Sequence, residues 1–281
     1  MHFSDLAILR WSGTGLAAAL ALSLSCAPVL AQSETAMPMS QVEAAYQSGD
    51  LATARAGLRA HAEAGNVLAQ HRLGYMIANA EGGPFDPAEA KRWLEAALAG
   101  ENRSGLVLLA RVYLSDNPEI TDYERAAELL EMAVQDGSAE AQYYLAQLYR
   151  LGRGVEADKV RAFELLRLAA GANMADAQYA LAEMYSRGEG TSKDAAQAAR
   201  YLLQAAEGGN GAAQMSLYFN YSRGTGFPKD AAKAQHWLEA AADNGEALAE
   251  RILGSAYLTG EGAEADPERG VSLLLRAAAK G

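Results

Sequence analysis

An internal repeat of 36 residues constrains the fold of this chain more than any other feature of its sequence. Aspartate and leucine recur at this interval seven times each, and alanine recurs six times. The aspartates are Asp50, Asp86, Asp122, Asp158, Asp194, Asp230 and Asp266; the alanines are Ala54, Ala90, Ala126, Ala162, Ala198 and Ala234; the leucines are Leu58, Leu94, Leu130, Leu166, Leu202, Leu238 and Leu274. A fixed period of roughly 20–50 residues is typical of repeat architectures, in which each unit is one supersecondary element.

Each unit reads as a hairpin of two helices. In the unit 139–174, two apolar stripes follow helical spacing. Gly152 stands where the first helix would end in a left-handed conformation. Asp158 precedes the second stripe, where its carboxylate can accept hydrogen bonds from free backbone N–H groups. The stripes are Ala141-Leu145-Leu148-Tyr149 and Ala162-Leu165-Leu166-Ala169.

One hairpin cannot bury its own apolar stripe, whereas stacked hairpins can. We therefore expect an all-α fold, a right-handed α/α superhelical solenoid of helical hairpins. Only 7% of the residues are aromatic and alanine is abundant, so the helices should cross closely through the alanine column. A larger side chain there should overpack, and we expect Ala162→Leu and Ala198→Leu to destabilise the fold by roughly 1–3 kcal/mol.

The N-terminal region has the pattern of a secretory signal peptide. Arg10 precedes an apolar run (15–24) that is shorter than the ~20 residues of a membrane-spanning helix. Val29-Leu30-Ala31 then fits a cleavage site, so residues 1–31 are expected to be removed before Gln32. Export to a periplasm or secretion follows. The alternative is a lipoprotein acylated on Cys26, the only cysteine.

The remainder of the chain divides according to the period. A flexible N-terminal segment (32–39) is followed by the solenoid (40–281), and no transmembrane segment is expected in the mature chain. The solenoid starts with an N-terminal capping hairpin and continues with six repeats. The predicted bounds are 40–66 for the hairpin and 67–102, 103–138, 139–174, 175–210, 211–246 and 247–281 for the repeats.

The sequence gives no sign of a cofactor, a metal site or a catalytic set. Gly152-Arg153-Gly154 follows a helix and lacks the context of a phosphate-binding loop, and the glycines recur with the period as turns. His61, His71 and His236 have no metal-ligand spacing. The net charge of −11 excludes nucleic acid as a favourable partner. We therefore expect a protein that is not an enzyme.

At this level of detail the pattern resembles the Sel-1-like repeat family. An Ala-x-Ala-Gln start, a tyrosine, a Gly-x-Gly turn, the aspartate and an aromatic residue in the second helix keep one phase over residues 40–281. The unit 103–138 departs from the pattern, with Asp116, Asn117 and Pro118 in place of the glycines. The resemblance implies a tetratricopeptide-like α/α array. The matching residues are Ala69-Gln70, Ala141-Gln142, Ala177-Gln178, Ala213-Gln214, Trp93, Tyr201 and Trp237.

By analogy with such arrays, the first helices should line a concave groove that binds a protein or peptide. Aromatic residues, methionine and arginine are the types that hold partners at interfaces. The alternative for Tyr143 and Tyr179 is packing between hairpins. The expected groove residues are Tyr75, Arg111, Tyr143, Gln147, Arg150, Tyr179, Glu183, Arg187, Met215, Phe219, Arg223 and Arg251, with His71 and Val107 beside them.

The leading interpretation is a non-catalytic scaffold, adaptor or regulator of the cell envelope with a protein or peptide partner. An acidic or carboxylate-ended peptide would suit the arginines of the groove. Two alternatives stay open. One is a protein that binds or modifies peptidoglycan, and the other is a weak hydrolase, as the resemblance to some secreted relatives implies.

Overall fold

The described part of the chain is helical throughout. The computed structural model describes residues 37–261 and 264–280, and within them it contains no strand. The signal peptide prediction (1–31) and Cys26 lie outside the described residues. The α-helices are α1 (Met39–Gln47), α2 (Leu51–Glu63), α3 (Val67–Ala78), α4 (Pro87–Ala99), α5 (Leu106–Tyr113), α6 (Tyr123–Gln135), α7 (Ala139–Leu151), α8 (Lys159–Gly171), α9 (Ala175–Arg187), α10 (Ala195–Glu207), α11 (Gly211–Arg223), α12 (Ala231–Asp243), α13 (Ala247–Thr259) and α14 (Pro267–Ala278), with a 3-10 helix at Arg103–Gly105 before α5.

The periodic aspartates start the second helix of every hairpin, as the sequence predicts. All seven are N-cap residues whose carboxylates accept a hydrogen bond from a backbone N–H group in the first turn. Asp158 accepts two, from the N–H groups of Val160 and Arg161. Gly152 ends α7 in the left-handed conformation with φ +65°, which confirms its predicted place at the turn. One short motif therefore sets both helix boundaries of a repeat.

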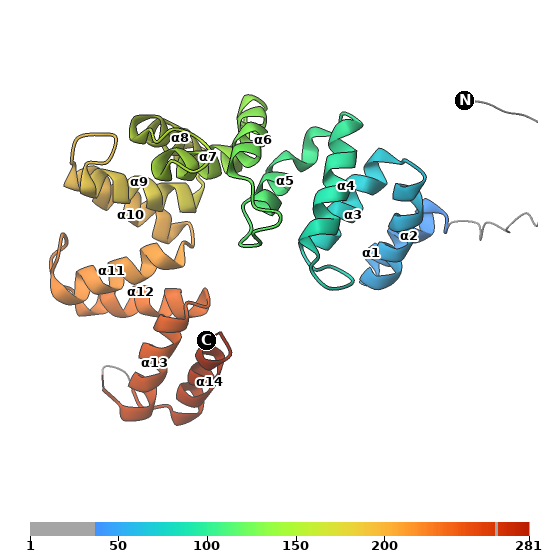
Figure 1. Cartoon of the computed structure of the whole chain (residues 1–281). Helices are drawn as coiled ribbons and strands as arrows, with labels where there is room; N and C mark the ends of the chain where they lie inside the picture. Colours follow the sequence, from blue (N-terminus) through green and yellow to red (C-terminus); the bar gives the residue numbers. More distant parts are fainter. Residues whose placement is uncertain (1–36, 262–263, 281) are drawn as a thin grey trace, which may run out of the picture. The chain divides into compact units, whose positions relative to one another are not determined.

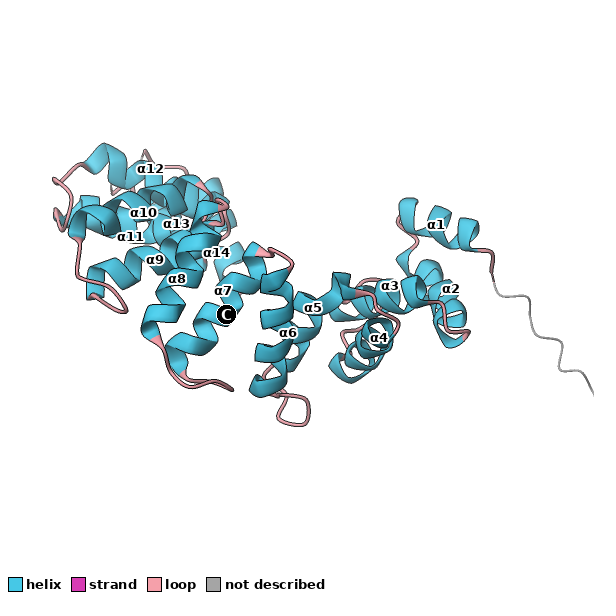
Figure 2. Cartoon of the chain, turned by 90° about the horizontal axis from the view of Figure 1, so that it is seen from above, coloured by secondary structure: helices cyan, strands magenta, loops and turns pink. Residues whose placement is uncertain are grey.

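The hairpins pack one after another in chain order (Figure 1). Helices of one hairpin contact each other, and the second helix of each hairpin contacts the first helix of the next. The same succession is visible from above in Figure 2. In the alanine column Ala54, Ala90, Ala126 and Ala162 are all 0% exposed, which leaves no room for a larger side chain. The predicted α/α solenoid is confirmed.

Two helix boundaries differ from the simple repeat. The first helix of the unit 103–138 is shortened to α5. In the loop after it, the backbone oxygen of Asn117 accepts hydrogen bonds from the N–H groups of Ile120 and Thr121. Helix α1 begins at Met39, within the segment predicted to be flexible (32–39), because the Pro38 carbonyl accepts the first turn's hydrogen bonds.

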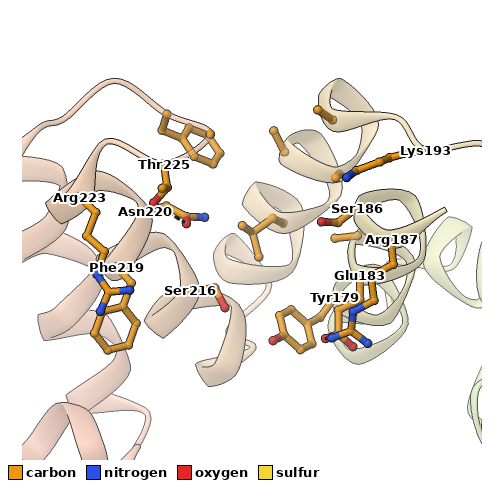
Figure 3. A pocket seen from close by; sticks show the side chains of 17 residues that line it. Tyr179, Glu183, Ser186, Arg187, Lys193, Ser216, Phe219, Asn220, Arg223 and Thr225 are labelled. Atoms are coloured by element: carbon orange, nitrogen blue, oxygen red, sulfur yellow. Dashed lines mark hydrogen bonds and ion pairs between the residues drawn. The ribbon is translucent and has the colours of Figure 1, made fainter. Parts of the chain in front are cut away.

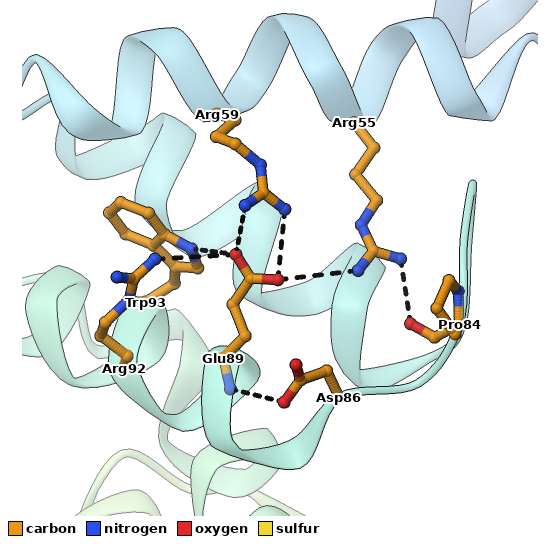
Figure 4. Close-up of polar contacts among 7 residues, drawn as sticks. All are labelled: Arg55, Arg59, Pro84, Asp86, Glu89, Arg92 and Trp93. Atoms are coloured by element: carbon orange, nitrogen blue, oxygen red, sulfur yellow. Dashed lines mark hydrogen bonds and ion pairs between the residues drawn. The ribbon is translucent and has the colours of Figure 1, made fainter.

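A cluster of charged side chains joins α2 to α4 (Figure 4). The Glu89 carboxylate lies 2.7 Å from a guanidinium nitrogen of Arg59 and 3.8 Å from one of Arg55. It also accepts a hydrogen bond from the indole N–H of Trp93. Arg55 is buried and donates to the carbonyl of Pro84 as well. The cluster therefore ties the first hairpin to the next repeat.

No helix among the described residues has the length and apolar character needed to span a membrane.

Candidate functional site

A glycine in the loop between the two helices of a repeat marks how closely that repeat approaches the one before it. At three junctions this glycine lies directly on the first peptide group of the preceding repeat's second helix, so that a Cβ atom would collide with backbone. At the junction of α10 and α11 the corresponding glycine, Gly226, has no atom near its Cβ position within 4 Å. The close pairs are Gly82 on Leu51, Gly154 on Tyr123 and Gly190 on Lys159.

The space left at this junction is a cleft of about 600 Å³, which we call the α10–α11 cleft. Its volume falls in the range of roughly 300–1,000 Å³ that is usual for ligand sites. Helices α9 and α10 form one side, and α11 with the loop after it forms the other (Figure 3). The lining residues are Tyr179, Ala182, Glu183, Ser186, Arg187, Lys193, Ala195, Ala198, Ala199, Leu202, Ser216, Phe219, Asn220, Arg223, Thr225, Gly226 and Phe227.

Helix α10 packs closely on α9, but the side of α10 that lines the cleft is less covered than the same side of α8 in the preceding repeat. Ala162 and Leu166 of α8 are both 0% exposed, whereas Ala198 and Leu202, which occupy the same columns in α10, are half-buried and line the cleft. Ala198 is therefore less buried than the alanine column predicts, although α10 still packs closely on α9. The period predicts equal junctions, but this junction is open.

Apolar and aromatic side chains cover much of the cleft. Leu202 and the small residues of α10 lie on one side, and Phe219 and Phe227 lie on the other. The ring of Phe227 packs on Tyr221, with 5.0 Å between the centroids, and belongs to the core of its own repeat. Tyr179 closes one end of the same apolar surface. A partner that entered the cleft would bury these groups.

The charged groups of the cleft are mostly cationic. Glu183 is the only carboxylate among the lining residues, and it already pairs with Arg187 at 2.8 Å and with Arg150 at 3.8 Å. Lys193 and Arg223 form no ion pair with any residue between 37 and 261 or 264 and 280. The Arg223 guanidinium lies over the ring of Phe219, 5.0 Å from its centroid. Two cations are thus available at the cleft.

The structure brings together five of the twelve groove residues expected from the sequence. These five come from α9 and α11 and point to the α10–α11 cleft (Figure 3). Met215, by contrast, is 7% exposed and packs in the core with Leu238 and Leu253, so it is not accessible to a partner. The five residues are Tyr179, Glu183, Arg187, Phe219 and Arg223.

The other expected groove residues lie outside the cleft. Arg111 pairs with Glu140 at 3.7 Å, while Gln147 is half-buried in α7. Arg150 pairs with Glu183 and with Glu189 at 3.8 Å, which holds two successive repeats together. Arg150 therefore serves the junction rather than a free surface.

Three tyrosine and arginine positions belong to other surroundings. Tyr143 packs edge-on against Tyr144 at 5.3 Å, and burial, followed by the nearby Asp176 charge, raises the pKa of its hydroxyl. Tyr143 is half-buried and packs against the core. Tyr75 is exposed beside a smaller hollow between α1 and α3, and Arg251 lies in another between α13 and α14.

Sequence reasoning missed the half of the cleft that α10 and the loops contribute, including Lys193, Leu202 and Phe227. One signal could have indicated it. The column 74, 110, 146, 182, 218 and 254 holds glycine or alanine everywhere except at Tyr218, whose ring lies between two core clusters. The extra volume of Tyr218 falls in the hairpin that borders the open junction.

The polar residues that line the cleft mostly carry hydroxyl groups or positive charge. The cleft is lined by two serines, Ser186 and Ser216, but by no histidine that could activate them. His61 instead bonds to the carbonyl of Met37 at 2.8 Å, and His236 packs on Trp237. Across the described residues, no group of three or more histidine, aspartate or glutamate side chains gathers as a metal site would require.

Comparison with known proteins accounts for the fold. The Sel1 repeat matches at residues 67–102, 104–138, 139–174, 175–210, 211–246 and 247–281. The chain is similar to the Sel1 repeat protein from Oxalobacter formigenes, with 30% identity and a TM-score of 0.70 over 85% of this chain and 73% of that one. No curated protein matches it.

A second similar structure is a protective antigen present in uropathogenic Escherichia coli strains, which displays an SLR fold. The identity is 28% and the TM-score 0.61, over 80% of this chain and 48% of the antigen. The chain thus spans about half the length of that relative. With six matched repeats and the first similarity together, the chain belongs to the Sel1 repeat family.

Proposed function

We propose that this chain is a non-catalytic interaction module of the cell envelope that binds a segment of a partner protein in the α10–α11 cleft. Sel1 repeat proteins generally mediate protein–protein interactions. The observation that carries the proposal is the open junction itself. The cleft combines aromatic side chains with two cations that lack ion pairs with described residues, and such groups contribute most to binding at protein interfaces.

The place in the envelope rests on the signal-like segment at residues 1–31. An exported scaffold, adaptor or regulator would meet its partner in the periplasm or outside the cell. Lipidation at Cys26 would hold the same module at a membrane surface. Labelling with a fatty-acid analogue, compared between the natural chain and Cys26→Ser, distinguishes these two forms.

The function is tested by capture from envelope extract with a tagged full-length chain. Ala198→Trp places a large ring in the cleft, whereas Ala196→Trp makes the same change at an exposed position of α10 that does not line the cleft. We expect one set of proteins to be retained by the natural chain and by Ala196→Trp and lost with Ala198→Trp. Both variants should keep the helical circular dichroism of the natural chain.

Equal capture by all three chains would show that partners bind elsewhere. A photo-crosslinking residue at Phe219 gives an independent check, because it should label the partner directly, while the same residue at the exposed Val160 should not. Retention on purified sacculi without a cleft-dependent protein would replace the proposal with binding to peptidoglycan. Release of soluble wall fragments would favour the hydrolase alternative.

A further inference from the structure

We infer that the α10–α11 cleft selects an acidic segment of its partner, one that carries a large apolar side chain among its carboxylates. This inference rests on the proposed function and adds the chemistry of the partner. It starts from an asymmetry of charge. The chain has 35 acidic and 24 basic residues, yet the cleft is lined by three basic residues and one acidic residue.

The single acidic residue of the cleft cannot attract a basic partner. Glu183 is held between Arg187 and Arg150, at 2.8 and 3.8 Å, and its side chain is 28% exposed. Two guanidinium groups therefore neutralise it. A lysine or arginine of a partner would have to displace one of them and would meet the other as a like charge.

Lys193 and Arg223 approach the cleft from opposite sides. Lys193 precedes α10, while Arg223 ends α11, and Figure 3 shows them on the two walls. Neither has an ion-pair partner in the described part of the chain, although most arginines there do have one. A segment that crossed the cleft could offer one carboxylate to each cation, in the charge-assisted hydrogen bonds that are among the strongest in proteins.

Arg223 is available for this role. Its guanidinium lies over the Phe219 ring, a cation–π contact that leaves its N–H donors available. A carboxylate can accept two parallel hydrogen bonds from such a fork. The same cleft is lined by Ala198, Leu202 and Phe227, which offer an apolar surface. This surface fits one large apolar side chain of the same segment.

The charge of the whole chain sharpens the selection. At −11 it repels acidic partners at long range, and the repulsion acts on every acidic chain alike. Binding therefore requires a close fit to the cleft cations. The same net charge, with two available cations, disfavours nucleic acid, which needs several phosphate contacts for stable binding.

The test is fluorescence anisotropy with the full-length chain and a short fluorescent probe peptide of aspartate and glutamate around one tryptophan. Matched probes replace every acid by its amide, replace every acid by lysine, or replace the tryptophan by glycine. We expect the acidic probe to bind about fivefold more tightly than the amide probe, because two exposed charge pairs together contribute about 1 kcal/mol. Raising the salt from about 50 to 300 mM should narrow this difference.

Two charge-matched double variants locate the binding. Lys193→Gln with Arg223→Gln should abolish the preference for the acidic probe. Lys91→Gln with Arg251→Gln removes the same charge outside the cleft and should keep it within about twofold. All variants must retain the helical circular dichroism of the natural chain. Because the side chains of Lys193 and Arg223 are both exposed, their replacement should leave the fold intact.

Equal binding of the acidic and amide probes would overturn the inference, as would tighter binding of the lysine probe. An equal loss of the preference for the acidic probe in the two double variants would also overturn it. So would competition by a single-stranded oligonucleotide of equal charge. A glycine probe that binds as well as the tryptophan probe would refute the apolar part. These failures differ from failure of the proposed function. If Ala198→Trp still loses the captured envelope proteins while the acidic probe does not bind, the cleft is a partner site of another chemistry.

Discussion

Leucine substitutions in one alanine column should have opposite effects at a closed and an open junction. Ala162 and Ala198 occupy the same position of successive repeats, so the added atoms and the local helix are alike. Ala162 is 0% exposed, and a leucine there must push neighbouring helices apart. We expect Ala162→Leu to lower the free energy of unfolding by about 1–3 kcal/mol.

Ala198 faces the cleft of about 600 Å³ and has room for the larger side chain. Each added carbon group contributes about 0.8 kcal/mol when it leaves water completely. Because the cleft is open to solvent, the three added groups are only partly buried. We expect Ala198→Leu to stabilise the chain by about 1 kcal/mol, after a small loss for side-chain ordering.

Urea denaturation followed by circular dichroism measures both variants, with Ala126→Leu as a second closed-junction case. Repeat arrays do not always unfold in one step, so hydrogen exchange should locate the change in α8 or α10. The opposite signs are the essential result. If Ala198→Leu destabilises the chain as much as Ala162→Leu does, the junction is closed in solution and the cleft cannot be the binding site.

Three further predictions concern the junctions and the first hairpin. In urea denaturation, Gly190→Ala should destabilise the chain by about 1–2 kcal/mol more than Gly226→Ala does. Both glycines have positive φ, but only a Cβ atom at position 190 would collide with the preceding repeat. Equal effects would contradict the open junction. The variant Glu89→Ala should lower the free energy of unfolding by about 2–3 kcal/mol, because it leaves the buried Arg55 without its carboxylate partner. The control Glu164→Ala removes an exposed ion pair and should change the same quantity by less than about 0.5 kcal/mol. Burial, then a neighbouring arginine, lowers the pKa of His71 below 6.5, so the stability that neutral His71 contributes is present above pH 6.5 and is lost as the pH falls. The variant His71→Gln should therefore lose less stability between about pH 7.5 and 5.5 than the natural chain. An identical loss in both chains would refute this assignment.

The fold could be predicted from the sequence because the repeat encodes its own boundaries. An aspartate such as Asp158 satisfies backbone donors at a helix start, and a glycine such as Gly152 permits the left-handed end, whatever the neighbouring repeat does. These are local interactions within a few residues. Because these interactions recur at one spacing, the sequence predicts the helical hairpins. The alanine column predicts that successive hairpins stack closely on one another.

The site could be predicted only in part, because it depends on the contact between repeats. Tyr179, Phe219 and Arg223 were found from their positions on the first helices. Leu202 was missed because the second helices are expected to be covered by the next repeat, and Lys193 because it lies in the loop before α10. Met215 was misplaced for a different reason: it occupies the same column as Tyr179, but it packs away from the cleft, with Leu238 of α12 and Leu253 of α13. A periodic pattern describes the average junction and not the one that departs from it.

The open junction also gives binding a consequence for stability. In a solenoid, the interface between neighbouring repeats supplies much of the stability of each unit. Here the two sides of the α10–α11 cleft leave apolar groups such as Leu202 and Phe219 half-buried. A segment that fills the cleft would cover both sides at once and add contacts between them. Because a ligand stabilises the state that it binds, occupancy should strengthen the coupling between the repeats before and after the cleft. Binding would then couple the repeats on the two sides of the cleft more strongly, without a change in the fold of any repeat.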